Sequence, residues 1–330
     1  MLYGKGVWIL YSAHLDLAVE MAREIGATHL FYRAGHRGMF FPEAALRVSQ
    51  RARSAGLVPF AWLHAPTDRP SEVVRIARRS VEFGYQGVVL DIVPLSQRMA
   101  QKVEMLGRQL IDAGFNPEAL YYSAPSAISR HPDIPYQQLN LLCRGGFMPK
   151  CTPLLGKPPE VAVHKLTYEE HHRWSKVWGY GPPLYPVLSP SRDEEGRELL
   201  EPAEFFGWIS ALAEHRPTFF SVFHASVTPR NLWPLLAEME VPRPPQALDA
   251  PPFLEPLRST AQSGEAEDAA EPEEPPLVVT VQVSDTVWTL CERYGCTREQ
   301  FWEWNGYLWD ERGWPRDANY LQPGWRVRVR

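Results

Sequence analysis

The run Val88-Val89-Leu90-Asp91-Ile92-Val93 decides how the first 241 residues are interpreted. It is hydrophobic apart from Asp91, and an amphipathic helical stretch, residues 97–113, follows it. A strand in a parallel sheet reads as a nearly continuous hydrophobic run, because helices cover the sheet. The run therefore predicts a parallel β-strand followed by a crossover helix.

The same pairing of an apolar run with a helical stretch recurs on both sides of this segment. The strand-like runs are residues 6–12, 28–34, 57–64, 87–93, 120–124, 146–151, 184–189 and 218–225. The helical stretches are residues 15–25, 42–55, 71–83, 97–113, 136–144, 168–178, 203–215 and 232–239. Eight strand and helix units in this length predict an α/β fold, a (β/α)8 TIM barrel over residues 1–241.

A doubly wound open sheet is the alternative, because the helical stretch 136–144 is short. That fold commonly carries a glycine-rich phosphate-binding turn after its first strand. Tyr11-Ser12-Ala13-His14 stands at that place instead. The barrel is therefore favoured.

Composition changes sharply between residues 242 and 276, where nine prolines and eight acidic residues stand against two arginines. Like charges repel one another and prolines favour extended chain, so this segment cannot bury enough apolar surface to form a core. It predicts a linker over 242–276, between a barrel over 1–241 and a small module over 277–330.

Several classes of partner and location are excluded or favoured by composition. The net charge of -5 provides no basic stripe for nucleic acid. No apolar run approaches the ~18 residues of a membrane span. The N-terminal run has no basic region before it and no cleavage site, so we expect no signal peptide, synthesis in the cytoplasm, and association with a cell wall or a virion after release.

The four cysteines match no zinc-binding spacing, and neither a metal nor a cofactor is expected. Buried free thiols are favoured for all four, Cys143, Cys151, Cys291 and Cys296. A bridge between Cys291 and Cys296, which stand five positions apart, stays open as an alternative.

Barrel chemistry lies at the carboxyl ends of the strands. The residues at those ends are Tyr11, Arg33, His64, Asp91, Tyr122, Lys150, Ser189 and His224, with His36, Asp68, Asp193, Glu194 and Glu195 in the loops beyond. Asp91 is the strongest candidate, because a carboxylate within a hydrophobic strand is costly to bury unless it has partners or a function. Arg33, His64, Tyr122 and Lys150 complete the predicted cluster at the barrel mouth.

Residues 26–34, 55–62 and 84–93 resemble the first half of glycoside hydrolase families 25 and 18, barrels that cleave peptidoglycan and chitin. Both families place Asp-x-Glu at the end of strand four, with the Glu as proton donor. Asp91 matches the Asp, whereas Val93 stands in the place of the Glu, and Gly6-Val7-Trp8 lacks the first-strand aspartate of family 25. Because glycoside hydrolysis ordinarily needs two carboxyls, the resemblance implies a glycosidase-like barrel that has lost its activity, unless the loop 191–195 provides the second carboxyl.

Residues 279–297 resemble the opening of a LysM module: a strand, a helix start, an apolar-spaced helix and a Tyr-Gly stop. Ser284 or Asp285 can cap that helix, whose apolar face is Val287, Leu290 and Cys291, and Gly295 can end it. A second helix over 298–304, a turn and a closing strand over 321–329 complete a βααβ module.

In the LysM family the glycan lies between the loop after the first strand and the loop before the last. The resemblance carries this role to Ser284, Asp285, Thr286, Val287, Leu321, Gln322 and Pro323. This chain departs from the family in having Ser284 where Gly is usual and in an enlarged second loop, residues 307–316.

Two functions follow from these resemblances. The first is a protein that binds peptidoglycan or another N-acetylglucosamine polymer and keeps a degenerate barrel, as a wall-associated component or a phage virion or tail component with structural protein partners. The alternative is an active cell-wall hydrolase of lysozyme type, which its LysM module holds close to the substrate.

Overall fold

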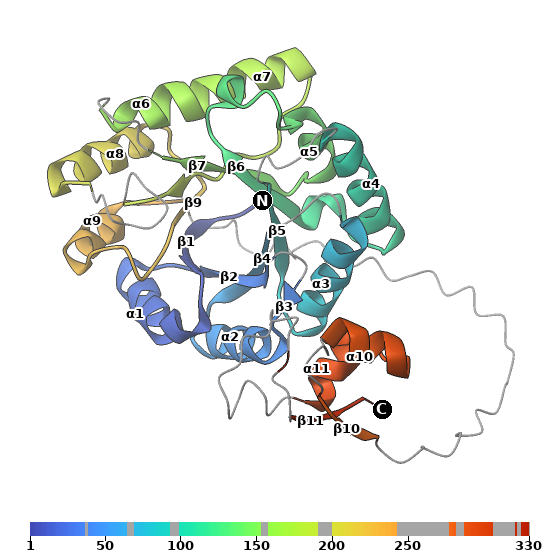
Figure 1. Ribbon diagram of the computed structural model, residues 1–330. Coiled ribbons are helices and arrows are strands. Elements are labelled where there is room, and N and C mark those ends of the chain that lie inside the picture. Colours follow the sequence, from blue (N-terminus) through green and yellow to red (C-terminus); the bar gives the residue numbers. More distant parts are fainter. Residues whose placement is uncertain are drawn as a thin grey trace, which may run out of the picture. The chain divides into compact units, whose positions relative to one another are not determined.

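The computed structural model describes residues 1–36, 39–64, 69–92, 99–152, 158–190, 200–242, 277–281, 287–305, 321 and 325–329 (Figure 1). The chain divides into two compact units, Met1–Ser259 and Thr260–Arg330. The division falls inside the segment that the sequence predicts as a linker, most of which lies outside the described residues. The linker and the limits of the three segments therefore stay predictions.

The first unit is a closed barrel of eight parallel strands. They are β1 (Gly4–Ile9), β2 (His29–His36), β4 (Val58–His64), β5 (Gly87–Asp91), β6 (Leu120–Pro125), β7 (Gly146–Cys151), β8 (Val187–Leu188) and β9 (Phe219–Val222). Each strand pairs with its neighbour in the chain, and β1 pairs in parallel with both β2 and β9. That closure confirms the predicted (β/α)8 barrel and excludes the open sheet.

Helices surround the barrel on its outside (Figure 1). They are α1 (Leu15–Ile25), α2 (Pro42–Ser54), α3 (Pro70–Glu82), α4 (Met99–Asp112), α5 (Tyr136–Leu142), α6 (Glu160–Val163), α7 (Glu170–Trp178), α8 (Pro202–Glu214) and α9 (Trp233–Glu238). Short 3-10 turns are η1 (Ser12–His14), η2 (Pro117–Ala119), η3 (Ile128–Arg130) and η5 (Arg230–Leu232), and a π-helical stretch, η4 (His164–Glu169), joins α6 to α7.

Three details differ from the prediction. A two-residue strand, β3 (Met39–Phe40), pairs antiparallel with β2. The helix expected at 168–178 begins earlier, at Glu160, and passes through a π-helical stretch. The strand expected at 184–189 is reduced to β8 and one isolated bridge, because Pro186 has no amide hydrogen to donate to the sheet.

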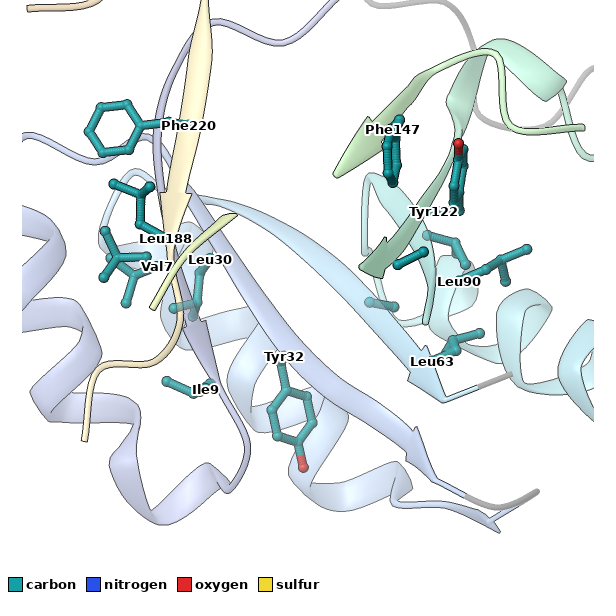
Figure 2. Packing of buried hydrophobic residues seen from close by; sticks show 14 of the residues in the cluster. Val7, Ile9, Leu30, Tyr32, Leu63, Leu90, Tyr122, Phe147, Leu188 and Phe220 are labelled. Carbon is teal, nitrogen blue, oxygen red and sulfur yellow. The ribbon is translucent and has the colours of Figure 1, made fainter. Parts of the chain in front are cut away.

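Alternate residues of each strand build two separate apolar layers. The outward layer packs between strands and helices, and Figure 2 shows part of it, including Val7, Leu30, Leu90 and Phe220. The inner layer fills the barrel interior with Leu2, Trp8, Phe31, Phe60, Trp62, Val89, Tyr121, Met148, Tyr185, Val187 and Phe219.

Lys5 of β1 joins the first and last helices of the barrel. Its buried ammonium donates to the backbone oxygens of Ile25 at 3.0 Å, Leu236 at 2.7 Å and Ala237 at 2.9 Å. These carbonyls lie at the C-terminal ends of α1 and α9, where a positive charge is favoured. Burial opposes the charged form and lowers the pKa of Lys5 to about 8.

The second unit is a βααβ module. Strand β10 (Val278–Thr280) pairs antiparallel with β11 (Arg326–Arg328), and α10 (Val287–Tyr294) and α11 (Arg298–Trp304) lie between them in the chain. Gly295 has a φ of 72°, the left-handed conformation expected after α10. Its core is Val281, Val287, Leu290, Cys291, Phe301, Leu321, Val327 and Val329.

Two polar contacts fix the second helix of the module. Thr297 accepts from the Gln300 amide at 3.1 Å while the Gln300 side chain accepts from the Thr297 amide at 2.9 Å, a reciprocal cap that the sequence analysis missed. The fully buried Asn305 donates to the oxygens of Phe301 and Arg328 and accepts from the Arg328 amide. It therefore ties the end of α11 to the closing strand.

All four cysteines are free, as the sequence favours, and Cys291 and Cys296 are not bridged. None of the helices in the described ranges is both long and apolar enough to cross a membrane.

Candidate functional site

Four of the predicted mouth residues face the interior at the carboxyl ends of their strands. Each stands two positions after an inner-layer residue of the same strand, and successive residues alternate between the two faces. Arg33 follows Phe31, His64 follows Trp62, Asp91 follows Val89, and Lys150 follows Met148. The structure therefore brings Arg33, His64, Asp91 and Lys150 to the same end of the barrel.

Asp91 is held by Lys150. Its Oδ1 lies 2.8 Å from the Lys150 Nζ, and the carboxylate is buried whereas the lysine side chain is 32% exposed. Within the sheet, Asp91 is in register with His64 on β4 and Ser123 on β6. The charge that stood out in the sequence is thus neutralised by a partner two strands away.

Arg33 is a cation without a carboxylate partner among the described residues. Its guanidinium carbon lies 5.2 Å from the centre of the Tyr11 ring and 5.9 Å from the centre of the Trp62 ring. Its Nε is buried and has no hydrogen-bond partner in the described part of the chain. Tyr11, beyond the end of β1, is 56% exposed.

Aromatic rings form the floor beneath these charges. The Trp62 ring meets Trp8 edge to face at 5.3 Å between centres, and Phe223 at 5.6 Å. The Trp8 indole N–H donates to Ser221 Oγ at 2.8 Å. The Trp62 indole N–H is buried too, yet no described residue accepts from it.

His224, another strand-end candidate, lies near the same floor. It is buried, its ring stands perpendicular to Phe223, and its Nδ1 lies 2.8 Å from Ser226 Oγ. Burial first, and then the positive charges of His14 and Arg33, lower the pKa of His224 to about 4. It is therefore uncharged near neutral pH, and among the described strand-end residues Arg33 and Lys150 carry two positive charges against the one negative charge of Asp91.

Tyr122 does not belong to the mouth, which corrects the sequence prediction. Its ring lies in the outward layer, stacked on Phe147 at 4.6 Å between centres, as Figure 2 shows. Its hydroxyl donates to Asn140 Oδ1 of α5 at 2.6 Å. The neighbouring Tyr121 occupies the inner layer instead, so Tyr122 necessarily faces the helices.

At the strand ends of the described part of the chain, Asp91 is the single carboxylate. Val93, Asp68, Asp193, Glu194 and Glu195 lie outside the described residues. The described residues also contain no group of three or more His, Cys, Asp or Glu side chains placed to hold a metal ion.

The predicted glycan-binding residues of the second unit are described only in part. The side chains of Val287 and Leu321 are buried in the module core, so only their backbone can meet a ligand. Ser284, Asp285, Thr286, Gln322 and Pro323 lie outside the described residues. Their role stays a prediction.

Trp62 was not predicted as a site residue, although the sequence contains a signal for it. Phe60, Trp62 and His64 stand at every second position of one strand, so the side on which His64 reaches the mouth is also the side of Trp62. Trp8 and Ser221 depend on contacts across the barrel closure, which no local pattern reveals.

Comparison with known proteins identifies the second unit. Residues 279–330 match the LysM domain family, so the C-terminal unit is a LysM domain. No curated protein sequence matches the chain.

Solved structures resemble the barrel. The catalytic domain of the hyperthermophilic chitinase from Pyrococcus furiosus has a TM-score of 0.50 and 8% identity, over 68% of this chain and 84% of that one. A class V chitinase from Nicotiana tobaccum with NAG4 has a TM-score of 0.50 and 12% identity, over 72% of this chain and 99% of that one. The PgaB glycoside hydrolase domain from Bordetella bronchiseptica has a TM-score of 0.50 and 8% identity, over 73% of this chain and 100% of that one. At such low identity these likenesses show the fold alone, a barrel whose structural neighbours are glycoside hydrolases.

Proposed function

We propose that this protein attaches through its LysM domain to a polymer containing N-acetylglucosamine, such as peptidoglycan, and that its barrel binds sugar without hydrolysing it. The LysM match supports the attachment. The observation that carries the second half is the ion pair between Asp91 and Lys150 at 2.8 Å.

The chemistry of glycoside cleavage explains why this ion pair matters. One carboxyl must protonate the leaving oxygen, and a second must act as nucleophile or base. In an ion pair Asp91 is a carboxylate, which only accepts hydrogen bonds and has no proton to give. With valine at position 93, the described barrel provides no acid for the leaving group.

The attachment is tested by sedimenting the full chain with peptidoglycan, chitin or cellulose. Retention on the first two, but not on cellulose, is expected. Asp285→Ala should reduce this retention, because the helix it is proposed to cap loses about 1 kcal/mol. Equal retention on cellulose would contradict specificity for N-acetylated sugars.

An active cell-wall hydrolase is the second candidate, favoured by the chitinase-like fold and by the polar cluster at the carboxyl end of the barrel. It requires a second carboxyl, for which Asp193, Glu194 and Glu195 are the first candidates. We expect purified protein to release no reducing ends from peptidoglycan. Release that Asp91→Asn abolishes would establish the second candidate instead.

Both wall association in a cell and a place in a phage virion or tail agree with the proposed binding. Either setting provides structural protein partners. Fractionating producing cells and any released particles, with detection of the chain in each, distinguishes the two.

A further inference from the structure

We propose that the barrel mouth binds the carboxylate of an acidic sugar, with Arg33 and Trp62 as the donors. This inference deepens the proposed function, since it rests on the barrel being a sugar-binding domain, and it names the class of sugar. N-acetylmuramic acid and uronic acids carry such a carboxylate, whereas chitin does not.

The charges at the mouth favour an anion. Asp91 is already paired with Lys150, and no described carboxylate approaches Arg33. A half-buried guanidinium without a counter-charge loses hydration, and the Tyr11 and Trp62 rings on which it lies provide no carboxylate to replace it. A ligand carboxylate would supply the missing partner.

The unsatisfied hydrogen-bond donors of Arg33 and Trp62 also favour a carboxylate as the ligand group. Arg33 and Trp62 stand directly opposite each other in the register of β2 and β4, and the guanidinium lies over the indole. Arg33 Nε and Trp62 Nε1 are both buried and both lack an acceptor among the described residues. Leaving a buried donor unsatisfied is costly, and native proteins rarely do so without a reason.

A carboxylate has the acceptors that both donors lack. It has two oxygens, it can accept two parallel bonds from a guanidinium, and it can accept a further bond from an indole N–H, which only donates. The neighbouring Trp8 shows the contrast, because its N–H is already bonded to Ser221 within the protein.

One of the two aromatic rings that lie on the Arg33 guanidinium belongs to a surface side chain. The Tyr11 ring lies on the guanidinium and is 56% exposed, and exposed side chains change rotamer rapidly. A sugar carboxylate that approaches Arg33 can therefore displace the Tyr11 ring without disturbing the core.

The test is calorimetric titration of the full chain with three soluble disaccharides. They are N-acetylglucosamine linked to N-acetylmuramic acid, N-acetylglucosamine linked to glucuronic acid, and neutral diacetylchitobiose. We expect an acidic disaccharide to bind at least about tenfold more tightly than the neutral one, which measures the background of the LysM domain. Binding of only one acidic disaccharide would also support the proposal and would identify the source of the carboxylate.

Variants assign the effect to the mouth. Arg33→Gln should remove the preference for the acidic sugar, and Arg47→Gln, at an exposed arginine of α2, should keep it. Trp62→Phe keeps a ring but loses the N–H, so it should weaken acidic binding severalfold and leave chitobiose unchanged. Asp91→Asn should strengthen acidic binding, because it frees Lys150, an effect that a merely structural role would not produce.

Equal affinity for all three disaccharides, or an unchanged preference in Arg33→Gln, would overturn the proposal. If Arg33→Gln does not fold, Arg33→Lys is the substitute, because it keeps the charge and removes the paired donors. Its preference for the acidic sugar should be weaker than that of the native chain but should not vanish. Retention on chitin reports the LysM domain and should survive Arg33→Gln. If the native chain is not retained on chitin, the proposed attachment is rejected, whereas the proposal for the barrel mouth is not affected.

Discussion

Two indole rings of the barrel interior, Trp8 and Trp62, lie edge to face at 5.3 Å between centres but have different surroundings. Trp8 stacks on Phe31 at 4.4 Å and bonds to Ser221, so its ring and its N–H are both satisfied within the protein. Trp62 lies below Arg33, and its N–H has no acceptor in the described part of the chain. The interior at the level of Trp8 and below it, here called the lower interior, bonds the Trp8 N–H within the protein. At the mouth, the N–H groups of Trp62 Nε1 and Arg33 Nε have no acceptor among the described residues.

His29 shows how completely the lower interior satisfies its polar groups. The ring is buried among Phe31, Phe60 and Phe219, and its Nδ1 lies 2.7 Å from Thr28 Oγ1. Burial lowers the pKa of His29 to about 4, so the ring is uncharged at neutral pH. Residues that stabilise the barrel and residues proposed to bind a ligand thus lie at different positions along the same strands.

Removing the Trp8 ring should break the lower interior and have the largest effect. Trp8→Ala leaves a cavity in a well-packed layer and should lower the free energy of unfolding by about 3–5 kcal/mol. Guanidinium denaturation followed by circular dichroism measures the loss. Tyr11→Ala is the control, because that ring is exposed and should change stability by less than about 0.5 kcal/mol.

Acid should unfold the lower interior through His29. Its pKa is about 4 in the folded chain and about 6.5 when unfolded, so the unfolded chain binds more protons between these values. Stability is therefore full above about pH 6.5 and falls towards pH 4, by up to about 3 kcal/mol for this group. His29→Gln should flatten the pH dependence of the unfolding midpoint, whereas His172→Gln, at an exposed histidine, should leave it unchanged.

Breaking the ion pair should affect the mouth by a smaller amount. Lys150→Met leaves the buried Asp91 carboxylate without its counter-charge and should cost about 1–3 kcal/mol. Adding Asp91→Asn removes the orphaned charge and should recover part of that cost in a double-mutant cycle. Lys165→Met, at an exposed lysine, is the matched control; an equal loss there would contradict the role of the pair.

The smallest effect is expected from a substitution that leaves the Trp8 N–H without an acceptor, as the Trp62 N–H is among the described residues. Ser221→Ala removes the acceptor of the Trp8 N–H and should cost about 1 kcal/mol. Thermal unfolding should detect it. No loss would show that an unsatisfied indole is inexpensive in this interior, which would weaken the argument drawn from Trp62.

The sequence predicts the strands well because each apolar run is bounded and is followed by a helix. It predicts the inward side of a strand less well. In Leu120-Tyr121-Tyr122 all three residues are apolar or aromatic, so the alternation does not show which tyrosine faces inward, and a one-residue error exchanges the faces. This ambiguity is why the sequence prediction for Tyr122 is wrong.

The contacts that make the mouth chemically distinctive are long-range. Asp91 and Lys150 belong to strands separated by β6, and no spacing rule pairs them before the barrel is built. The LysM domain was accessible from its sequence because its signals are local: the apolar face Val287, Leu290 and Cys291 of one helix and Gly295 at its end. Its glycan-binding loops, by contrast, still depend on the family resemblance.

The hydrogen bonds of Lys5 have a consequence for how the chain folds. They reach carbonyls 231 and 232 positions away, and β1 must also pair with β9. Such distant contacts form slowly, because a long loop has to close before they contribute any stability. During synthesis β1 emerges first and keeps an unpaired edge until the last barrel unit arrives, which is the interval in which the nascent chain is most exposed to aggregation.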